Sequence, residues 1–311
     1  MPIPESITTL YAVDWRILMT AATQWWHGGN PYGYLSPEFG RPGAFAYPPT
    51  ALSWLWLFLH FGGAGFIIWT TLQLGGWWLL IRRHFRSQLM LLSWSPLFFH
   101  LLIGQTTLSI VLVLWAATES TRRGFWWGVA VAWAMTKPQA ALLPLVWLLW
   151  QDRAVPHRHL FWLGIVVGTS ALALPPTLMN PGIWVDWIHS LSDYRTRTMQ
   201  MVPWQGFGIP ILIAACLLWF HRNRGNQKAG GWQWWLSAAL FPQTALYSTV
   251  VLLPLLRPKL NYWTIAGLAL SSLLIGPATD ITLPIILSGH ILAAWFICGG
   301  PRADNQERVT S

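Results

Sequence analysis

The side chains best suited to chemistry in this chain are one acid near the amino terminus and a few distant cations. Asp14 lies between Val13 and Trp15, and partial burial beside a tryptophan is predicted to raise its pKa toward the range of a general base. A carboxylate held within hydrogen-bond reach of a hydroxyl can remove its proton. The alternative is an ordinary acid at the start of a helix, because the run from Asp14 to Trp26 also has helical character.

Three basic side chains are candidates for binding an anion. Lys137 lies between two apolar stretches and beside Pro138, which ends or kinks a helix. It could grip an anion or extend to lipid headgroups. Arg195 and Arg197 follow residues 184–189, which have the pattern of a helix lying in the membrane interface. The two arginines could clamp a phosphate or, alternatively, bind lipid headgroups.

Other chemical signals in the chain are weak. His27 and His100 are possible ligands or bases, but neither has a second histidine three or four residues away, so a metal site has little support. Gly28-Gly29 lacks the preceding strand and the spacing of a nucleotide-binding loop and is better explained as a tight turn before Asn30-Pro31. We therefore expect neither a metal nor another cofactor.

The composition indicates an integral membrane protein. The chain is 54% hydrophobic and 9% charged, with a mean hydropathy of +0.43, whereas soluble domains carry about 25% charged residues. Its 25 tryptophans suit positions at lipid–water boundaries. The net charge of +9 would fit a nucleic-acid partner, but no basic run is long enough to support one. We expect membrane lipids as partners and no nucleic acid.

Apolar stretches separated by short loops predict an all-α fold, a polytopic transmembrane helix bundle with about 9–11 membrane segments. Residues 1–311 are treated as a single integral-membrane domain, and Thr50–His60 is predicted to be a short leading helix. Its parts are an outer loop at 1–49, a bundle at 50–300, an outer loop at 176–205 with the interfacial helix, and a cytoplasmic tail at 301–311. The candidate spans are 64–81, 88–103, 105–118, 125–136, 139–150, 159–175, 206–220, 231–241, 243–256, 260–276 and 283–299.

The basic residues predict the orientation of this bundle. With these spans, 14 of the 19 Lys and Arg residues fall on one side, which the positive-inside tendency assigns to the cytoplasm. The Asp14 loop and Lys137 then lie on the extracytoplasmic side of the cell membrane, and the C-terminus is cytoplasmic. Two alternatives treat 125–150 and 231–256 each as one kinked helix, which would spoil this charge separation.

Several motifs, taken in order, resemble glycosyltransferase family 87, whose members have the GT-C fold and use polyprenyl-phosphate sugars. The resemblance covers roughly residues 10–205. The matching motifs are Asp14, Gly28-Gly29-Asn30-Pro31-Tyr32, Phe45-Ala46-Tyr47-Pro48-Pro49, Gly104-Gln105-Thr106-Thr107-Leu108, Lys137-Pro138-Gln139 and Pro181-Gly182-Ile183-Trp184.

The resemblance implies a transferase that moves a hexose (mannose or a related sugar) to a hydroxyl of a glycolipid or glycan acceptor. It also implies that the transfer inverts the anomeric configuration. It implies that Asp14 is the general base and that Lys137, with Arg195 or Arg197, holds the charge of the departing lipid phosphate. The residues that it implies in substrate binding are His27, Asn30, Tyr32, Tyr47, Gln105, Lys137, Gln139, Arg195 and Arg197.

Two other functions stay open at this point. A lipid-linked sugar flippase or small-molecule transporter would use the same cavity without making a bond, although transporters often show internal repeats and none is convincing here. An inactive scaffold descended from the family is the other alternative. Two departures from the family pattern motivate it: only thirteen residues precede Asp14, and the stretch at 241–247 lacks the Ser-Pro and histidine features of many members.

Overall fold

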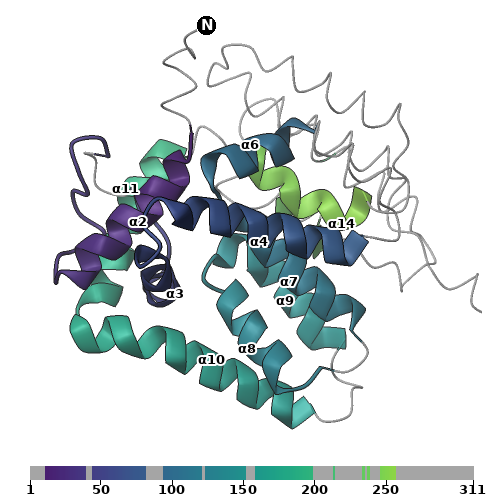
Figure 1. Ribbon diagram of the computed structural model, residues 1–311. Coiled ribbons are helices and arrows are strands. Elements are labelled where there is room, and N and C mark those ends of the chain that lie inside the picture. Colours follow the sequence, from purple (N-terminus) through teal and green to yellow (C-terminus); the bar gives the residue numbers. More distant parts are fainter. Residues whose placement is uncertain are drawn as a thin grey trace, which may run out of the picture. The chain divides into compact units, whose positions relative to one another are not determined.

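The structure is a computed structural model that describes residues 11–39, 44–81, 94–120, 123–151, 158–198 and 246–256, with residues 213, 233, 234, 237 and 238. All regular structure in these ranges is helical, which confirms the all-α class (Figure 1). The helices are α2 (Val13–Trp26), α3 (Thr50–Leu59), α4 (Ala64–Ile81), α6 (Ser95–Ile103), α7 (Thr107–Glu119), α8 (Phe125–Ala134), α9 (Pro138–Gln151), α10 (Arg158–Met179), α11 (Ile183–Thr198), the 3₁₀-helix η5 (Leu246–Leu252) and α14 (Leu253–Leu256).

The chain divides into two compact units. One consists of residues 1–80 and 99–197, and the other of residues 81–98 and 198–311. The first unit contains all the candidate site residues, from Asp14 to Arg197. In the second unit, η5 and α14 lie within the predicted 243–256 span, while the predicted spans 206–220, 231–241, 260–276 and 283–299 fall largely or wholly outside the described residues.

Prolines set two helix starts in the first unit, close to where the sequence predicts them. Pro48 and Pro49 precede α3, and their carbonyls accept the first hydrogen bonds of that helix, from Ala51 and Leu52. Pro138 is the first residue of α9. Proline suits such positions because its fixed φ is already helical and the first N–H groups of a helix have no partner within it.

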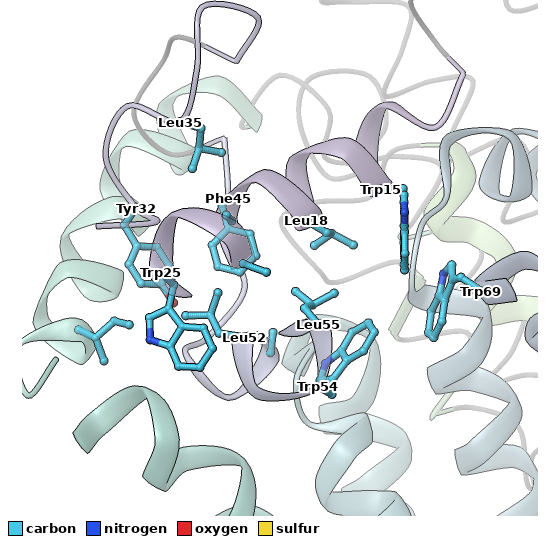
Figure 2. Packing of buried hydrophobic residues seen from close by; sticks show 14 of the residues in the cluster. Trp15, Leu18, Trp25, Tyr32, Leu35, Phe45, Leu52, Trp54, Leu55 and Trp69 are labelled. Carbon is cyan, nitrogen blue, oxygen red and sulfur yellow. The ribbon is translucent and has the colours of Figure 1, made fainter. Parts of the chain in front are cut away.

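Residues on facing sides of α2 and α3 make up most of the buried cluster drawn in Figure 2, which also includes Tyr32, Phe45 and Trp69. The buried side chains of α2 recur every three or four residues, the spacing of one helix face, and they are Trp15, Leu18, Ala21, Ala22 and Trp25. Those of α3 are Ala51, Leu52, Trp54 and Leu55. This contact fixes the two helices that flank the extended segment containing Tyr47.

Helices α8 and α10 approach each other through glycine. A Cβ atom added to Gly164 would lie 2.0 Å from the carbonyl oxygen of Phe125, and one added to Gly128 would lie 2.1 Å from that of Phe161. Gly168 follows Gly164 by four residues on the same face of α10. Small residues spaced by four are a common means of bringing apolar helices together in membranes, where close van der Waals packing stabilises association.

Helix α10 continues through Met179, four residues beyond the predicted end of its span at 175, although Pro175 and Pro176 lie inside it. A proline at 176 cannot donate to the carbonyl of Leu172. The hydroxyl of Ser53 on α3 donates to that carbonyl instead, at 2.7 Å. A side chain from another helix therefore replaces the backbone hydrogen bond that the proline removes.

Helix α10 is also long and apolar enough to cross a membrane. Two bent pairs, α3 with α4 and α6 with α7, each qualify when the two helices are taken together, and each pair bends by 116°. The described residues therefore contain one candidate span, or up to three if each bent pair is one span. Helices α8 and α9 are apolar but shorter.

Candidate active site

A carboxamide connects the predicted base to the predicted cation. The Gln105 Nε2 donates to Asp14 Oδ2 at 2.5 Å, and the Lys137 Nζ donates to Gln105 Oε1 at 2.6 Å. These three residues come from α2, the break between α6 and α7, and the break between α8 and α9. The structure thus brings together three residues that the sequence singles out separately.

Tyr47 completes this network. Its hydroxyl accepts from Lys137 Nζ at 3.1 Å, donates to Gln105 Oε1, and lies 2.9 Å from Thr106 Oγ1. The Lys137 ammonium also lies 5.2 Å from the centre of the Tyr47 ring, within the range of a cation–π contact. Lys137 therefore has neutral oxygens and an aromatic face around it.

The start of α2 is held against the end of α6. Ala12 adopts a left-handed conformation with φ of 53°, which is uncommon for a residue with a side chain, and its N–H donates to the Leu102 carbonyl at 2.8 Å. Asp14 then lies in the first turn of α2, as the helix-start alternative predicts. Its carboxylate also reaches Gln105, so the two interpretations are compatible.

Gly104 makes the break between α6 and α7. Its φ is +75°, and an added Cβ would lie 2.6 Å from the Cβ of Trp15 and 2.9 Å from the ring of Phe66. A side chain at 104 would therefore be strained and would collide with the residue next to Asp14. This close approach explains why a glycine directly precedes Gln105.

Lys137 lies directly before α9, where its carbonyl accepts from Ala140 and Ala141. Its side chain is only 5% exposed. No carboxylate of the described residues lies within ion-pair distance of its ammonium. The cation is thus buried next to the site without a directly bound anion.

The segment that carries Tyr47 is tied down on both sides. Tyr32 OH donates to the Tyr47 carbonyl at 2.9 Å, and Trp187 Nε1 of α11 donates to the Ala46 carbonyl at 3.1 Å. The Phe45 and Tyr47 rings stack at 5.7 Å, and Figure 2 shows Tyr32 beside Phe45. Burial, followed by the charge of Asp186, raises the pKa of Tyr32, so its phenol stays protonated and can donate.

Burial perturbs both ionisable groups of the site, and both lie outside the candidate spans. It raises the pKa of the Asp14 carboxyl to about 6, against the opposing effects of the Lys137 charge and the Gln105 hydrogen bond. It lowers the pKa of the Lys137 ammonium to about 7, against the opposing effect of Asp14. Near neutral pH, Asp14 can therefore be a carboxylate while Lys137 is an ammonium, and the free-energy cost of protonating one or deprotonating the other is small.

The other predicted site residues lie farther out. Asn30 accepts from the Tyr32 N–H at 2.9 Å and shapes the turn after α2. His27 is exposed and caps the far end of α2, about 20 Å from Asp14 by the rise of the helix. Gln139 is half-buried in the first turn of α9. Arg195 and Arg197 lie in the last turns of α11, and their side chains are outside the described residues.

Residues that the sequence did not single out also support the site. Trp69 Nε1 and Gln73 Nε2 donate to the Gln105 carbonyl at 3.4 and 3.2 Å, and Thr106 N donates to Gln105 Oε1 at 2.8 Å. The sequence feature that could have pointed to this support is Gln73, because it is an amide side chain in an otherwise apolar helix. In the described part of the chain, no three His, Cys, Asp or Glu residues form a group that could hold a metal ion.

A carboxylate, a carboxamide and an ammonium in this order can accept a proton at one end and meet an anion at the other. Comparison with known proteins agrees with the motifs. The sequence model of glycosyltransferase family 87 matches residues 45–277, a range that includes Tyr47, Gln105 and Lys137 and begins after Asp14. No curated protein and no solved structure matches the chain.

Proposed function

Since this chain belongs to glycosyltransferase family 87 and is therefore a membrane glycosyltransferase, we propose that it moves a hexose of the mannose type from a polyprenyl-phosphate sugar to an acceptor hydroxyl. The acceptor is a glycolipid or glycan, and the site faces the non-cytoplasmic side of the cell membrane. The observation that supports this most directly is the hydrogen-bonded chain from Asp14 through Gln105 to Lys137.

Asp14 acts as the general base. Among the described residues, Gln105 is the sole hydrogen-bond partner of its carboxylate, and Asp14 is only half-buried, so an acceptor hydroxyl can reach it. As the hydroxyl oxygen attacks the anomeric carbon, Asp14 takes its proton. The bond from that carbon to the phosphate oxygen breaks on the opposite face, the lipid phosphate leaves with the electron pair, and the configuration inverts.

Lys137 stabilises the departing lipid phosphate. It is a buried cation that donates to the neutral oxygens of Gln105 and Tyr47, and none of the described carboxylates lies at contact distance from it, so it can bind an incoming phosphate. Preorganised charge of this kind in a low-dielectric site is often the largest contribution to rate enhancement. Arg195 and Arg197, at the end of α11, are proposed as further phosphate contacts.

We further propose that the chain forms a GT-C bundle of about 9–11 membrane segments with a cytoplasmic C-terminus, on the basis of its apolar stretches and its distribution of basic residues. Labelling of single cysteines from each side of sealed vesicles tests this topology. Labelling of position 139 and position 311 from the same side would contradict it.

The decisive experiment compares Asp14→Asn with Glu38→Gln in reconstituted vesicles supplied with a synthetic polyprenyl-phosphate hexose and an acceptor. Asp14→Asn keeps the size of the side chain and removes the base, so we expect transfer to fall roughly 10²–10⁴-fold. Glu38 is an exposed acid paired with Arg16, and its variant should transfer normally. Transfer at the wild-type rate by Asp14→Asn would refute the assignment of the base.

The same vesicles distinguish the alternatives. Movement of the lipid-linked sugar between leaflets without a new glycosidic bond would identify a flippase or transporter instead. Failure of the purified protein to bind polyprenyl phosphate would support an inactive scaffold. The anomeric configuration of the product, measured by NMR, tests inversion separately, because a retained configuration would require a different mechanism.

A further inference from the structure

Two buried polar side chains lie directly behind Gln105. Gln73 of α4 is 2% exposed and His100 of α6 is 0% exposed, and both helices belong to bent pairs that are candidate membrane spans. Polar groups buried away from water are costly unless they are hydrogen-bonded, and polar residues inside membrane helices usually have a functional role. The proposed mechanism does not use either side chain.

Hydrogen bonds connect this pair to the backbone of Gln105. The Gln73 Nε2 donates to the Gln105 carbonyl at 3.2 Å, and the Gln73 Oε1 lies 3.0 Å from His100 Nε2. The Gln105 N–H donates to the His100 carbonyl at 3.1 Å. The Gln73 side chain and Trp69 Nε1 therefore hold the Gln105 carbonyl, while the backbone of α6 holds the Gln105 N–H.

His100 Nε2 has two neighbours in this arrangement. The Leu108 N–H, in the first turn of α7, donates to it at 3.2 Å, and the Gln73 Oε1 lies 3.0 Å from it. A chain of contacts therefore runs from the start of α7 through His100 and Gln73 to the Gln105 carbonyl.

This chain matters because Gln105 lies at a sharp break. The α6–α7 pair bends by 116° there, and Gly104 allows the bend through its φ of +75°. The place of this carboxamide depends on where the turn holds the Gln105 backbone. Its two ends must also face opposite ways, with Nε2 toward Asp14 and Oε1 toward Lys137.

We propose that Gln73 and His100 are positioning residues that fix the Gln105 turn, so that its carboxamide orients the Asp14 carboxylate for proton abstraction. This inference rests on the proposed function. It assigns His100 a role in orientation in place of that of a metal ligand or base. The pair acts through Gln105 and touches neither substrate.

The test uses Gln73→Met and His100→Leu, which keep approximate size and remove the hydrogen bonds, and His100→Gln, which restores a hydrogen-bonding side chain at a similar reach. Thr71→Val, on the exposed side of α4, is the matched control. We expect Gln73→Met and His100→Leu to lower kcat about 10–100-fold with KM nearly unchanged, the pattern of a misplaced catalytic group. His100→Gln and Thr71→Val should retain most of the wild-type kcat.

A second measurement needs no substrate. A hydrophobic carbodiimide reacts with protonated carboxyl groups, so mass spectrometry of Asp14 labelling against pH reports the titration of that residue. The Gln105 hydrogen bond favours the carboxylate, and its loss in Gln73→Met should move the labelling midpoint to higher pH. Two other titratable residues surround this site. Lys137 faces Asp14 across Gln105, and Tyr47 contacts Gln105 and Lys137. Lys137 and Tyr47 are unchanged in these variants, so neither accounts for a shift of the midpoint.

The two measurements separate this inference from the proposed function. If wild type and Gln73→Met transfer sugar equally and label with the same midpoint, the positioning role is refuted while the glycosyltransferase stands. A loss of folded protein with normal kcat per folded molecule would also refute it. If the midpoint moves but wild type transfers no polyprenyl-phosphate hexose, the proposed function fails and the positioning role stands. Should Gln73→Met not fold, the His100 variants give the same decision.

Discussion

The proposed mechanism needs Asp14 ionised and Lys137 protonated, so the rate should depend on pH in a bell shape. As pH falls through about 6, Asp14 takes up a proton and ceases to be a base. As pH rises through about 7, Lys137 loses its proton and can no longer hold the phosphate. The donor is a phosphodiester and the acceptor a sugar hydroxyl, and neither titrates in this range, so both limits belong to the enzyme.

The two pKa values set the height and width of this curve. With limits at about 6 and about 7, roughly 60% of the molecules hold the active protonation state near pH 6.5, and about 9% do at pH 5 or pH 8. We therefore expect kcat/KM to fall about sevenfold from its maximum at either extreme. The assay is the initial rate of sugar transfer at low donor concentration, in detergent or in vesicles equilibrated to each pH.

Lys137→Arg isolates the alkaline limb. A guanidinium stays protonated throughout this range, so the variant should keep the acid limb of Asp14 and lose the decline above pH 7, even if the larger group lowers its overall rate. Lys137→Met, which has no charge, should be slow at every pH. A flat wild-type profile between pH 5 and pH 8, or an alkaline limb that persists in Lys137→Arg, would refute the assignment of these roles.

Two further predictions concern packing and stability. Gly164→Ala places a methyl group 2.0 Å from the Phe125 carbonyl oxygen, which cannot rotate away. We expect this variant to lose about 1–3 kcal/mol of stability, measured as a lower melting temperature in detergent. The control is Gly75→Ala, whose added methyl group meets nothing within 4 Å, and it should keep the wild-type melting temperature. Ser53→Ala should cost about 1–2 kcal/mol because it leaves a carbonyl of α10 without a partner. In a Pro176→Ala background, where the backbone can supply that bond, the same change should cost less, and an equal cost would contradict this account.

Local patterns in the sequence were enough to predict most of the described helices. Apolar runs and prolines act within a few residues, so α3 was expected at Thr50–His60 and lies at Thr50–Leu59, and the span expected at 139–150 lies within α9, Pro138–Gln151. Helix α10 extends four residues beyond the span predicted at 159–175 and continues through Pro175 and Pro176. A hydroxyl 119 residues away allows the helix to continue, and no local pattern contains that contact.

The site followed the same division between local and distant information. Residue type and neighbours were sufficient to select Asp14 and Lys137, and the Gly-Gln motif drew attention to Gln105. The bridge itself joins residues 91 positions apart in one bond and 32 in the other, which the chain order does not reveal. Gln73 was overlooked because a single amide in an apolar helix gives no motif, although its polarity at membrane depth was a signal in its own right.

The bridging amide also explains how a base and a cation can share one small site. The attraction between two opposite charges falls as their separation grows, and Gln105, which is hydrogen-bonded to both groups, keeps them from direct contact. A direct ion pair would have to be broken before either group met its substrate. With Gln105 between them, Asp14 keeps an oxygen for the hydroxyl and Lys137 keeps most of its charge for the phosphate. A Gln105→Ala variant would remove the side chain that keeps Asp14 and Lys137 apart. The orientation of the neutral Gln105 carboxamide is therefore central to the chemistry proposed for this protein.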